Sequence, residues 1–242
     1  MKCKSCKTKI KDKSADYCPY CGEPLSVSKF TDINIILDRS GSMGSVKEAT
    51  IIGFNNFLLE QSRVKGKAII SLYQFDNEYE TMYKNIPIND AKGLTDKSYQ
   101  PRATTALLDA IGKTINDKDI YYSTLNAKDK PELVLFVILT DGAENASREY
   151  TKSQIKKMIE DKKAKGWQFA FIGAGIDAFG DAHAGGMSFS KGATISAENT
   201  AVGIGDVFSN LIGSTVKYRS TGGQFLFHQK GSSSATSDED EE

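Results

Sequence analysis

The chain has no cysteine after residue 21, only two histidines, and no apolar run longer than residues 133–139. No disulfide can therefore staple the bulk of the chain, and nothing indicates an oxidising compartment. The longest apolar run is far too short to cross a bilayer, and the polar residues after Met1 do not read as a signal peptide. Basic and acidic residues balance at 31 each, so no overall charge attracts the chain to nucleic acid. These absences predict a cytoplasmic protein.

All four cysteines fall in two C-x₂-C pairs near the amino terminus. Cys3 and Cys6 form the first pair, Cys18 and Cys21 form the second, and 11 residues separate the pairs. Two such pairs can complete a tetrahedral thiolate site for Zn²⁺. The alternative is a redox-active pair, which needs a βαβ context that so short a lysine-rich segment cannot supply. The segment resembles the short zinc ribbon at the start of many bacterial proteins, whose second knuckle often reads C-P-x-C-G.

Lysines crowd this same segment and have two interpretations. They either touch phosphate groups of a nucleic acid or form a solvated surface; they are Lys2, Lys4, Lys7, Lys9, Lys11 and Lys13.

Strand-like and helix-like patterns alternate after a linker at 22–30. We expect strands at 32–38, 67–76, 133–139, 167–173 and 187–190, with 78–86 pairing antiparallel beside the second. We expect helices at 44–62, 105–117, 151–165, 177–183 and 198–217. The alternation predicts an α/β fold with a doubly wound, mainly parallel sheet and helices on both faces.

Polar segments stand where buried strands of this sheet end. Asp-Arg-Ser-Gly-Ser occupies 38–42 and Thr-Asp-Gly occupies 140–142, while Thr104 and Thr105 open a helix. Ligands on such sheets bind beyond the carboxyl ends of the strands. Carboxylates and hydroxyls are hard oxygen ligands that suit Mg²⁺, Mn²⁺ or Ca²⁺. With so few carboxylates the ion still needs an acidic ligand from outside, which favours a binding module over an enzyme. An ordinary polar turn is the alternative for 38–42.

The three segments together resemble the metal-ion-dependent adhesion site (MIDAS) of von Willebrand factor A (vWA) domains. The likeness covers residues 30–215 and includes Ala-Leu-Leu-Asp-Ala after Thr105, which is similar to the family's T-x-L-x-D-A. It implies that a partner's Asp or Glu completes a Mg²⁺-type site whose ligands are Asp38, Ser40, Ser42, Thr105 and Asp141. The family commonly places glycines before this threonine, whereas Arg102-Ala103-Thr104 stand there in this chain, which leaves Thr104 as a rival ligand.

Three parts of the chain follow from these patterns. We expect a zinc ribbon at 1–26, a vWA domain at 30–218, and a C-terminal extension at 219–242 with a disordered acidic tail. The stretch 224–227 (Gln-Phe-Leu-Phe) either packs back on the domain or serves as a peptide for another protein. The acidic tail is either a solubilising segment or a docking peptide.

The resemblance implies a non-catalytic protein-interaction module, and the lysine- and isoleucine-rich composition suggests a bacterial or phage multiprotein assembly. One alternative is a nucleic-acid-binding adaptor that acts through the zinc ribbon. Another is a Mg²⁺-dependent phosphatase or hydrolase with Asp38 as nucleophile, although Ser40 stands where haloacid-type phosphatases carry a second acid. The histidines, His183 and His228, lie beside no serine or cysteine arrangement typical of a catalytic triad.

Overall fold

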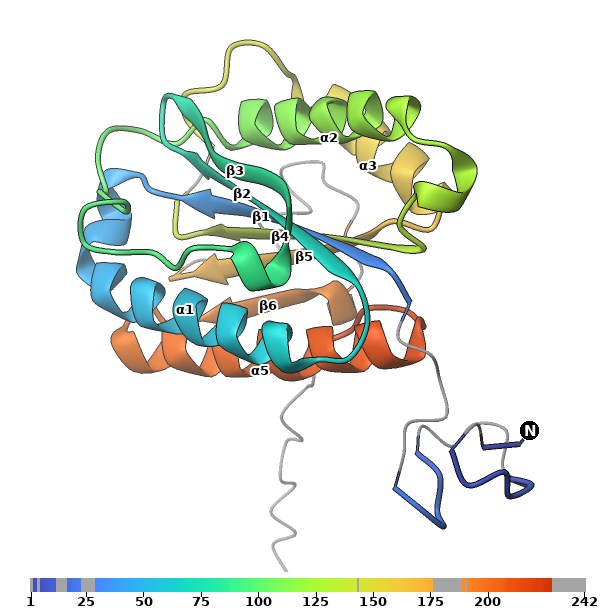
Figure 1. Ribbon diagram of the computed structural model, residues 1–242. Coiled ribbons are helices and arrows are strands. Elements are labelled where there is room, and N and C mark those ends of the chain that lie inside the picture. Colours follow the sequence, from blue (N-terminus) through green and yellow to red (C-terminus); the bar gives the residue numbers. More distant parts are fainter. Residues whose placement is uncertain are drawn as a thin grey trace, which may run out of the picture.

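A six-stranded sheet forms the centre of the large domain in this computed structural model (Figure 1). The structure describes residues 2–3, 5–11, 17–22, 29–142, 144–175, 189 and 191–227. The strands are β1 (Thr31–Asp38), β2 (Ala68–Phe75), β3 (Tyr79–Pro87), β4 (Leu133–Thr140), β5 (Gln168–Ala174) and β6 (Thr194–Ala197). The helices are α1 (Lys47–Arg63), α2 (Leu107–Thr124), α3 (Lys152–Ala164) and α5 (Ala201–Thr221), with short 3₁₀ turns η1 (Gly41–Val46), η2 (Ile88–Asp90), η3 (Ala127–Asp129) and η4 (Lys191–Ala193).

The strand order is β3-β2-β1-β4-β5-β6, and every neighbouring pair is parallel except β2 with β3. The order reverses between β1 and β4, so the crevice beyond the carboxyl ends of these two strands is the topological switch point. Asp38 ends β1 and Thr140 ends β4. The fold therefore places both predicted metal-binding segments at the edge of the sheet where ligands bind.

Two apolar cores cover the two faces of the sheet. Residues Ile33, Ile35 and Leu37 of β1 pack on the side of α1 and α5, whereas Ile36 packs with α2 and α3. Figure 1 shows these helix pairs on opposite sides of the sheet. Alternate residues of a strand point to opposite faces, and a strand covered on both faces is apolar throughout. This explains the apolar run at 133–139, all of which is buried in β4.

A buried ion pair fixes α2 to the sheet from the end opposite the switch point. The ammonium of Lys118 lies 2.8 Å from the Asp32 carboxylate and 2.9 Å from the Ser71 hydroxyl, and it also donates to Asn85 Oδ1. Tyr122 donates a further hydrogen bond to Asp32 at 2.6 Å. The lysine and the aspartate are both fully buried. Such a pair is tolerated in an apolar interior only when its remaining hydrogen bonds are satisfied, as they are here.

Strand β3 is one edge of the sheet and departs from regular pairing. Asn85 has a left-handed backbone (φ +58°), and the register with β2 shifts between Ile70 and Leu72 and again before Tyr73. The bulge directs the Asn85 side chain toward Lys118. Most of the strand's side chains are partly or fully exposed.

The predicted fold class is confirmed, and most predicted elements match within a few residues. The helix predicted at 105–117 is wrong at its end, because α2 continues to Thr124. The turns beyond 117 carry Lys118 and Tyr122 into the buried network. The helix predicted from 44 begins at Lys47, after the 3₁₀ turn η1. The last helix, predicted at 198–217, is α5 at 201–221.

The structure differs more from the predictions toward the carboxyl end of the chain. The last strand among the described residues is β6 at 194–197. Of the range 187–190, predicted as the last strand, only Phe189 is described, and it lies outside any strand. The helix expected at 177–183 lies outside the described residues. The predicted domain boundary at 218 falls inside α5, and Phe225 and Phe227 are buried in the core beneath it. Within the described residues, no helix combines the length and apolar composition that a bilayer span requires.

Candidate metal centres

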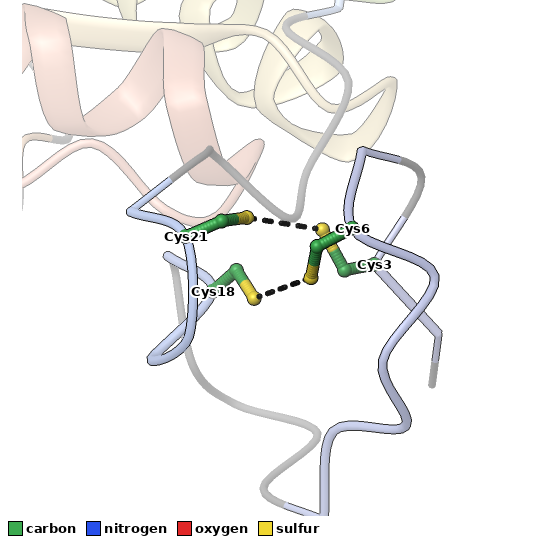
Figure 2. Close-up of side chains that lie close together, drawn as sticks. All are labelled: Cys3, Cys6, Cys18 and Cys21. Carbon is green, nitrogen blue, oxygen red and sulfur yellow. Dashed lines mark hydrogen bonds between the residues drawn. The ribbon is translucent and has the colours of Figure 1, made fainter.

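The four cysteines of the amino-terminal segment converge on one point. Their sulfur atoms all lie within 4.8 Å of one another. Figure 2 shows the side chains of the two knuckles facing each other, with Cys3 Sγ 3.6 Å from Cys21 Sγ and Cys6 Sγ 3.5 Å from Cys18 Sγ. Two thiolates bound to one tetrahedral Zn²⁺ at about 2.3 Å lie about 3.8 Å apart. No disulfide joins these cysteines, which are all in the described part of the chain. The donor set therefore fits a four-thiolate zinc site.

The backbones of the two knuckles repeat each other. Lys7 N–H donates to Cys3 O at 3.1 Å, and Gly22 N–H donates to Cys18 O at 2.8 Å. Lys7 and Gly22 both adopt left-handed backbones, with φ of +61° and +70°. Gly22 thus stands at the glycine position of the C-P-x-C-G pattern, and its left-handed backbone forms the turn after the second pair. The equivalent role of Lys7 was not recognised, because lysine gives no signal for a left-handed turn.

Hydrogen bonding with Thr8 prepares one of the cysteines to bind a metal ion. The Cys6 thiol lies 3.3 Å from the Thr8 hydroxyl, and hydrogen bonds with the side chain and backbone of Thr8 lower the pKa of Cys6 to about 6. The thiolate is the form that binds a metal ion, so this cysteine is ready to coordinate at neutral pH.

The second centre begins with Asp38 at the end of β1. Its carboxylate is fully buried and accepts hydrogen bonds from Ser40 N–H at 2.6 Å and from the Thr140 hydroxyl at 2.5 Å. The Tyr99 hydroxyl, itself buried, donates to the Asp38 carbonyl oxygen at 2.6 Å. The loops that follow β1 and β4 are thereby joined through one aspartate.

Hydroxyl oxygens and a second carboxylate stand next to Asp38. The Ser40 and Ser42 hydroxyl oxygens are 3.2 Å apart, and the Ser42 hydroxyl donates to Asp141 Oδ1 at 2.6 Å. Adjacent ligands of an octahedral Mg²⁺ at about 2.1 Å are separated by about 3.0 Å. The spacing of these oxygens is therefore that of ligands sharing an edge of such a site.

The Thr105 hydroxyl lies beside these oxygens, next to Gly142, which has no side chain. A side-chain carbon built on Gly142 would lie 3.1 Å from the Thr105 hydroxyl oxygen and 3.7 Å from that of Ser42. Any larger residue at 142 would enter the space that these oxygens share. Thr105 is buried whereas Thr104 is exposed, so the geometry favours Thr105 of the two threonines. All five residues predicted as Mg²⁺-type ligands meet at this edge of the sheet.

The two carboxylates pay a desolvation cost that their hydrogen bonds only partly offset. Burial raises the pKa of Asp38 to about 6, against the hydrogen bonds from Thr140 and Ser40, and the charge of Asp141 raises it further. Burial likewise raises the pKa of Asp141 above its ordinary range. Two buried carboxylates side by side are what a bound divalent cation would stabilise.

Asn199, in the loop after β6, also reaches the centre. Its amide Nδ2 donates to Asp141 Oδ2 at 3.2 Å, while its Oδ1 is buried without a hydrogen-bond partner. The close approach depends on Gly175, where a side-chain carbon would lie 2.9 Å from Asn199 Cβ and where φ is +71°. Sequence reasoning missed this residue, because Asn199 lies in no recognisable motif.

A charged clamp holds the loops around the centre. Asp76, fully buried after β2, accepts hydrogen bonds from Arg39 Nε at 3.0 Å and Arg102 Nε at 2.8 Å. Arg102 also pairs with Glu78 at 2.6 Å, and Arg39 pairs with Glu80. Arg102, predicted to be either a surface residue or a contact for a partner's acid, is thus already engaged within the chain.

A second set of contacts ties the loop after β4 to the start of α2. Ala106, at the helix N-cap position, offers no side-chain hydrogen bond, and Glu144 supplies it by accepting from Leu108 N–H at 2.9 Å. Asp109 reaches in the opposite direction and accepts from the backbone N–H groups of Arg148, Glu149 and Tyr150. The resemblance had already singled out Asp109, whereas nothing in the sequence pointed to Glu144.

Known proteins resemble this chain in structure, whereas sequence comparison finds no match. No protein-family model matches the chain, and no curated protein matches its sequence. Among solved structures, the von Willebrand factor domain of the type V pili tip protein Mfa5 from Porphyromonas gingivalis superposes with a TM-score of 0.58 at 11% identity, covering 78% of this chain and 96% of that one. The large domain has the vWA fold.

Two further vWA-fold structures are similar over most of this chain. The pilus adhesin SpaC from Lactobacillus rhamnosus GG gives a TM-score of 0.58 at 13% identity, covering 78% of this chain and 30% of SpaC. Proximal thread matrix protein 1 from the mussel byssus, in a structure with a zinc-occupied MIDAS motif, gives a TM-score of 0.51 at 12% identity. The match covers 79% of this chain and 47% of that protein. The chain therefore spans less than half of either protein. At these identities the likeness establishes the vWA fold alone.

Ala103 offers a test of strain in the loop before Thr105. Its backbone is left-handed (φ +56°), a conformation that costs an alanine about 1 kcal/mol and a glycine almost nothing. We expect Ala103→Gly to raise the free energy of unfolding by about that amount in urea titrations. Ala127→Gly in η3, where φ is not positive, is the matched control and should lower it. Equal losses in both variants would contradict the assignment.

The cysteine cluster predicts one zinc ion per chain. Native mass spectrometry of protein purified without chelator should show this stoichiometry. Cys18→Ser should lose the metal, because three thiolates no longer close the tetrahedral site. Ser5→Ala, an exposed neighbour within the first knuckle, should keep it. Full zinc content in the Cys18 variant would exclude the four-thiolate arrangement.

Proposed function

We propose that the large domain is a non-catalytic protein-interaction module in which a Mg²⁺-type ion captures a carboxylate. The observation that carries this proposal is the convergence of three hydroxyls and two carboxylates at the switch point of the sheet, with Ser40 and Ser42 oxygens at the spacing of neighbouring octahedral ligands. Mg²⁺, Mn²⁺ and Ca²⁺ all accept such oxygen donors. The ligands would be Asp38, Ser40, Ser42, Thr105 and Asp141.

The hydrogen bonds of the two aspartates support capture of an outside acid. Both oxygens of Asp38 accept hydrogen bonds, from Ser40 and Thr140, and both oxygens of Asp141 accept them, from Ser42 and Asn199. These contacts leave the neutral hydroxyls as the most available direct ligands, and Asp38 and Asp141 would act on the ion directly or through water. A cation held mainly by neutral oxygens retains a strong attraction for one more carboxylate.

The geometry gives little support to the alternative of a phosphatase or hydrolase. A nucleophilic Asp38 would have to reach a substrate, yet its side chain is fully buried and both of its oxygens are engaged. The neighbours in fold are named as a pilus tip protein, a pilus adhesin and a thread matrix protein. They support an adhesive or scaffolding role for this chain, and we place it in a bacterial or phage multiprotein assembly.

The zinc ribbon favours a second contact, with protein or with nucleic acid. Four of its lysines, Lys2, Lys7, Lys9 and Lys11, are exposed. Binding of nucleic acid through them would weaken steeply with salt, by about one power of salt concentration for each phosphate neutralised. Four thiolates free of disulfides suit a reducing compartment, so we propose a cytoplasmic location.

The function is tested by metal-dependent binding of a carboxylate. Isothermal titration with Mn²⁺ should show one site beyond zinc, and this site should disappear in the double variant Asp38→Ala, Ser40→Ala. An acidic peptide, acetyl-Gly-Glu-Gly-amide, should bind only in the presence of Mn²⁺, and its glutamine counterpart should not bind. Asp129→Ala, an exposed acid on η3, is the matched control. Peptide binding that survives EDTA would refute the proposal.

Metal affinity should also depend on pH. Because the pKa of Asp38 is about 6 without metal, the carboxylate is protonated at lower pH and cannot neutralise the cation. The apparent Mn²⁺ affinity should therefore be constant above about pH 7 and fall toward tenfold per pH unit well below pH 6. Calorimetric titrations at pH 5.0, 6.0, 7.0 and 8.0 measure the trend. An affinity that does not change between pH 5 and pH 7 would speak against Asp38 as a charged ligand.

A further inference from the structure

We infer that Asn199 makes the metal site of the large domain select Mg²⁺ or Mn²⁺ over Ca²⁺, by holding the Asp141 carboxylate so that only one of its oxygens can meet the ion. This inference rests on the proposed function, because it names the ion that the same site accepts. Asn199 stands in the connection between β6 and α5, outside every predicted ligand segment. Its role depends on what its amide contacts, on how its backbone is held, and on how the two kinds of ion use a carboxylate.

Both oxygens of Asp141 are engaged by side chains from two other connections of the sheet. The Ser42 hydroxyl donates to Oδ1 at 2.6 Å, and Asn199 Nδ2 donates to Oδ2 at 3.2 Å. An ionised carboxylate can only accept hydrogen bonds, so the amide atom that faces it has to be the NH₂ group and not the carbonyl oxygen. The contact therefore fixes the orientation of the Asn199 side chain.

The backbone on either side of Asn199 is tied to the domain. Before it, Gly175 N–H donates to Ala197 O at 2.7 Å, and a side-chain carbon at Gly175 would come within 2.9 Å of Asn199 Cβ. After it, Thr200 caps α5, and its hydroxyl accepts from Gly203 N–H at 3.1 Å. Asn199 thus lies between a strand end and a helix cap, so its amide is pre-positioned against Asp141.

Ca²⁺ and Mg²⁺ use carboxylates differently. Ca²⁺ takes about six to eight oxygen ligands at about 2.3–2.6 Å and often binds both oxygens of one carboxylate. Mg²⁺ takes about six ligands at about 2.1 Å, demands octahedral geometry and usually keeps water. A site that offers only one oxygen from each carboxylate therefore suits the smaller ion.

The donors of the proposed site fill an octahedron and leave nothing further to offer. The three hydroxyls, one position for each aspartate, direct or through water, and one partner carboxylate occupy all of its positions. A further ligand for Ca²⁺ would have to be the second oxygen of Asp38 or Asp141. Asp38 is fully buried, and its oxygens are held by Ser40 N–H and the Thr140 hydroxyl. Asp141 is the one that could turn, and turning it to present both oxygens to the ion would break its bond to Asn199.

The carbonyl end of the same amide fits an ion that keeps its water. Asn199 Oδ1 is buried and has no hydrogen-bond partner within the described part of the chain. A buried acceptor without a partner is costly, and a missing water or ion commonly explains one. A water molecule on Mg²⁺ or Mn²⁺ beside Asp141 would donate the hydrogen bond that Oδ1 lacks.

A comparison of two ions tests the inference on the zinc-loaded full chain. Calorimetric titrations with Mn²⁺, as the six-coordinate probe, and with Ca²⁺ give the ratio of two dissociation constants. The test variants are Asn199→Ala and Asn199→Leu, which keeps the approximate shape of the side chain without a donor. In both, the ratio should move about tenfold toward Ca²⁺, because losing a hydrogen-bond partner of a metal ligand commonly costs roughly tenfold or more in affinity. An unchanged ratio in both variants, with Mn²⁺ still bound by the wild type, would overturn the inference and leave the proposed function standing.

Thr200→Ala is the matched control. It removes the cap of α5 and so loosens the same connection, but it keeps the amide that donates to Asp141. Its ratio should equal that of the wild type. A shift as large as that of Asn199→Ala would assign the effect to loop stability and overturn the inference. A wild-type protein that binds neither ion beyond zinc would instead refute the proposed function, and the inference with it.

Infrared difference spectroscopy reads the Asp141 carboxylate directly. The asymmetric and symmetric stretches of a carboxylate lie closer together when both oxygens bind one ion than when a single oxygen does. In protein labelled with ¹³C at the aspartate carboxyls, Ca²⁺-loaded Asn199→Ala should show a closely spaced pair of bands that the wild type lacks. Adding Asp141→Asn to that variant should remove the pair. Identical Ca²⁺ difference spectra for the wild type and Asn199→Ala would refute the restraint on Asp141.

Discussion

Two carboxylates removed from water side by side are the constraint on which the switch-point edge of this domain depends. Asp38 ends β1 and Asp141 directly follows β4; both are buried, and burial raises the pKa of each. Hydrogen bonds from Thr140, Ser40 and Ser42 recover only part of the lost hydration. A divalent cation bound beside the two carboxylates would offset the remaining desolvation cost.

Contacts among the surrounding loops keep the two buried carboxylates close together. Asp76 draws the side chains of Arg39 and Arg102 together, and Glu144 and Asp109 cross-link the loop after β4 to α2. These contacts join segments from four separate connections of the sheet. Ligand oxygens positioned by such a frame need little reorganisation when an ion binds, which is what pre-organised sites require.

The sequence predicted the strands and helices that have a periodic apolar pattern. It did not predict residues whose contact partners lie far away along the chain. The apolar run at 133–139 and the alternation of strand and helix patterns predicted the sheet correctly, and the polar segments that follow β1 and β4 lie at one edge of it. Lys118 was not identified from the sequence, because no local pattern reveals that Asp32, 86 positions away, would pair with it in the interior. Asn199 and Glu144 act through contacts that exist only after folding, and residues of their type are common in loops. The ligand roles themselves remain predictions.

The bulged strand β3 has a consequence for how copies of this protein can associate. An open sheet edge is a template on which another chain can add a strand, and long flat edges promote aggregation. Here the edge is kinked at Asn85, carries the charged Lys84, and ends in Pro87, which has no N–H to donate. These features disfavour growth of the sheet by strand addition along β3, so two copies of this domain are not expected to pair through this edge.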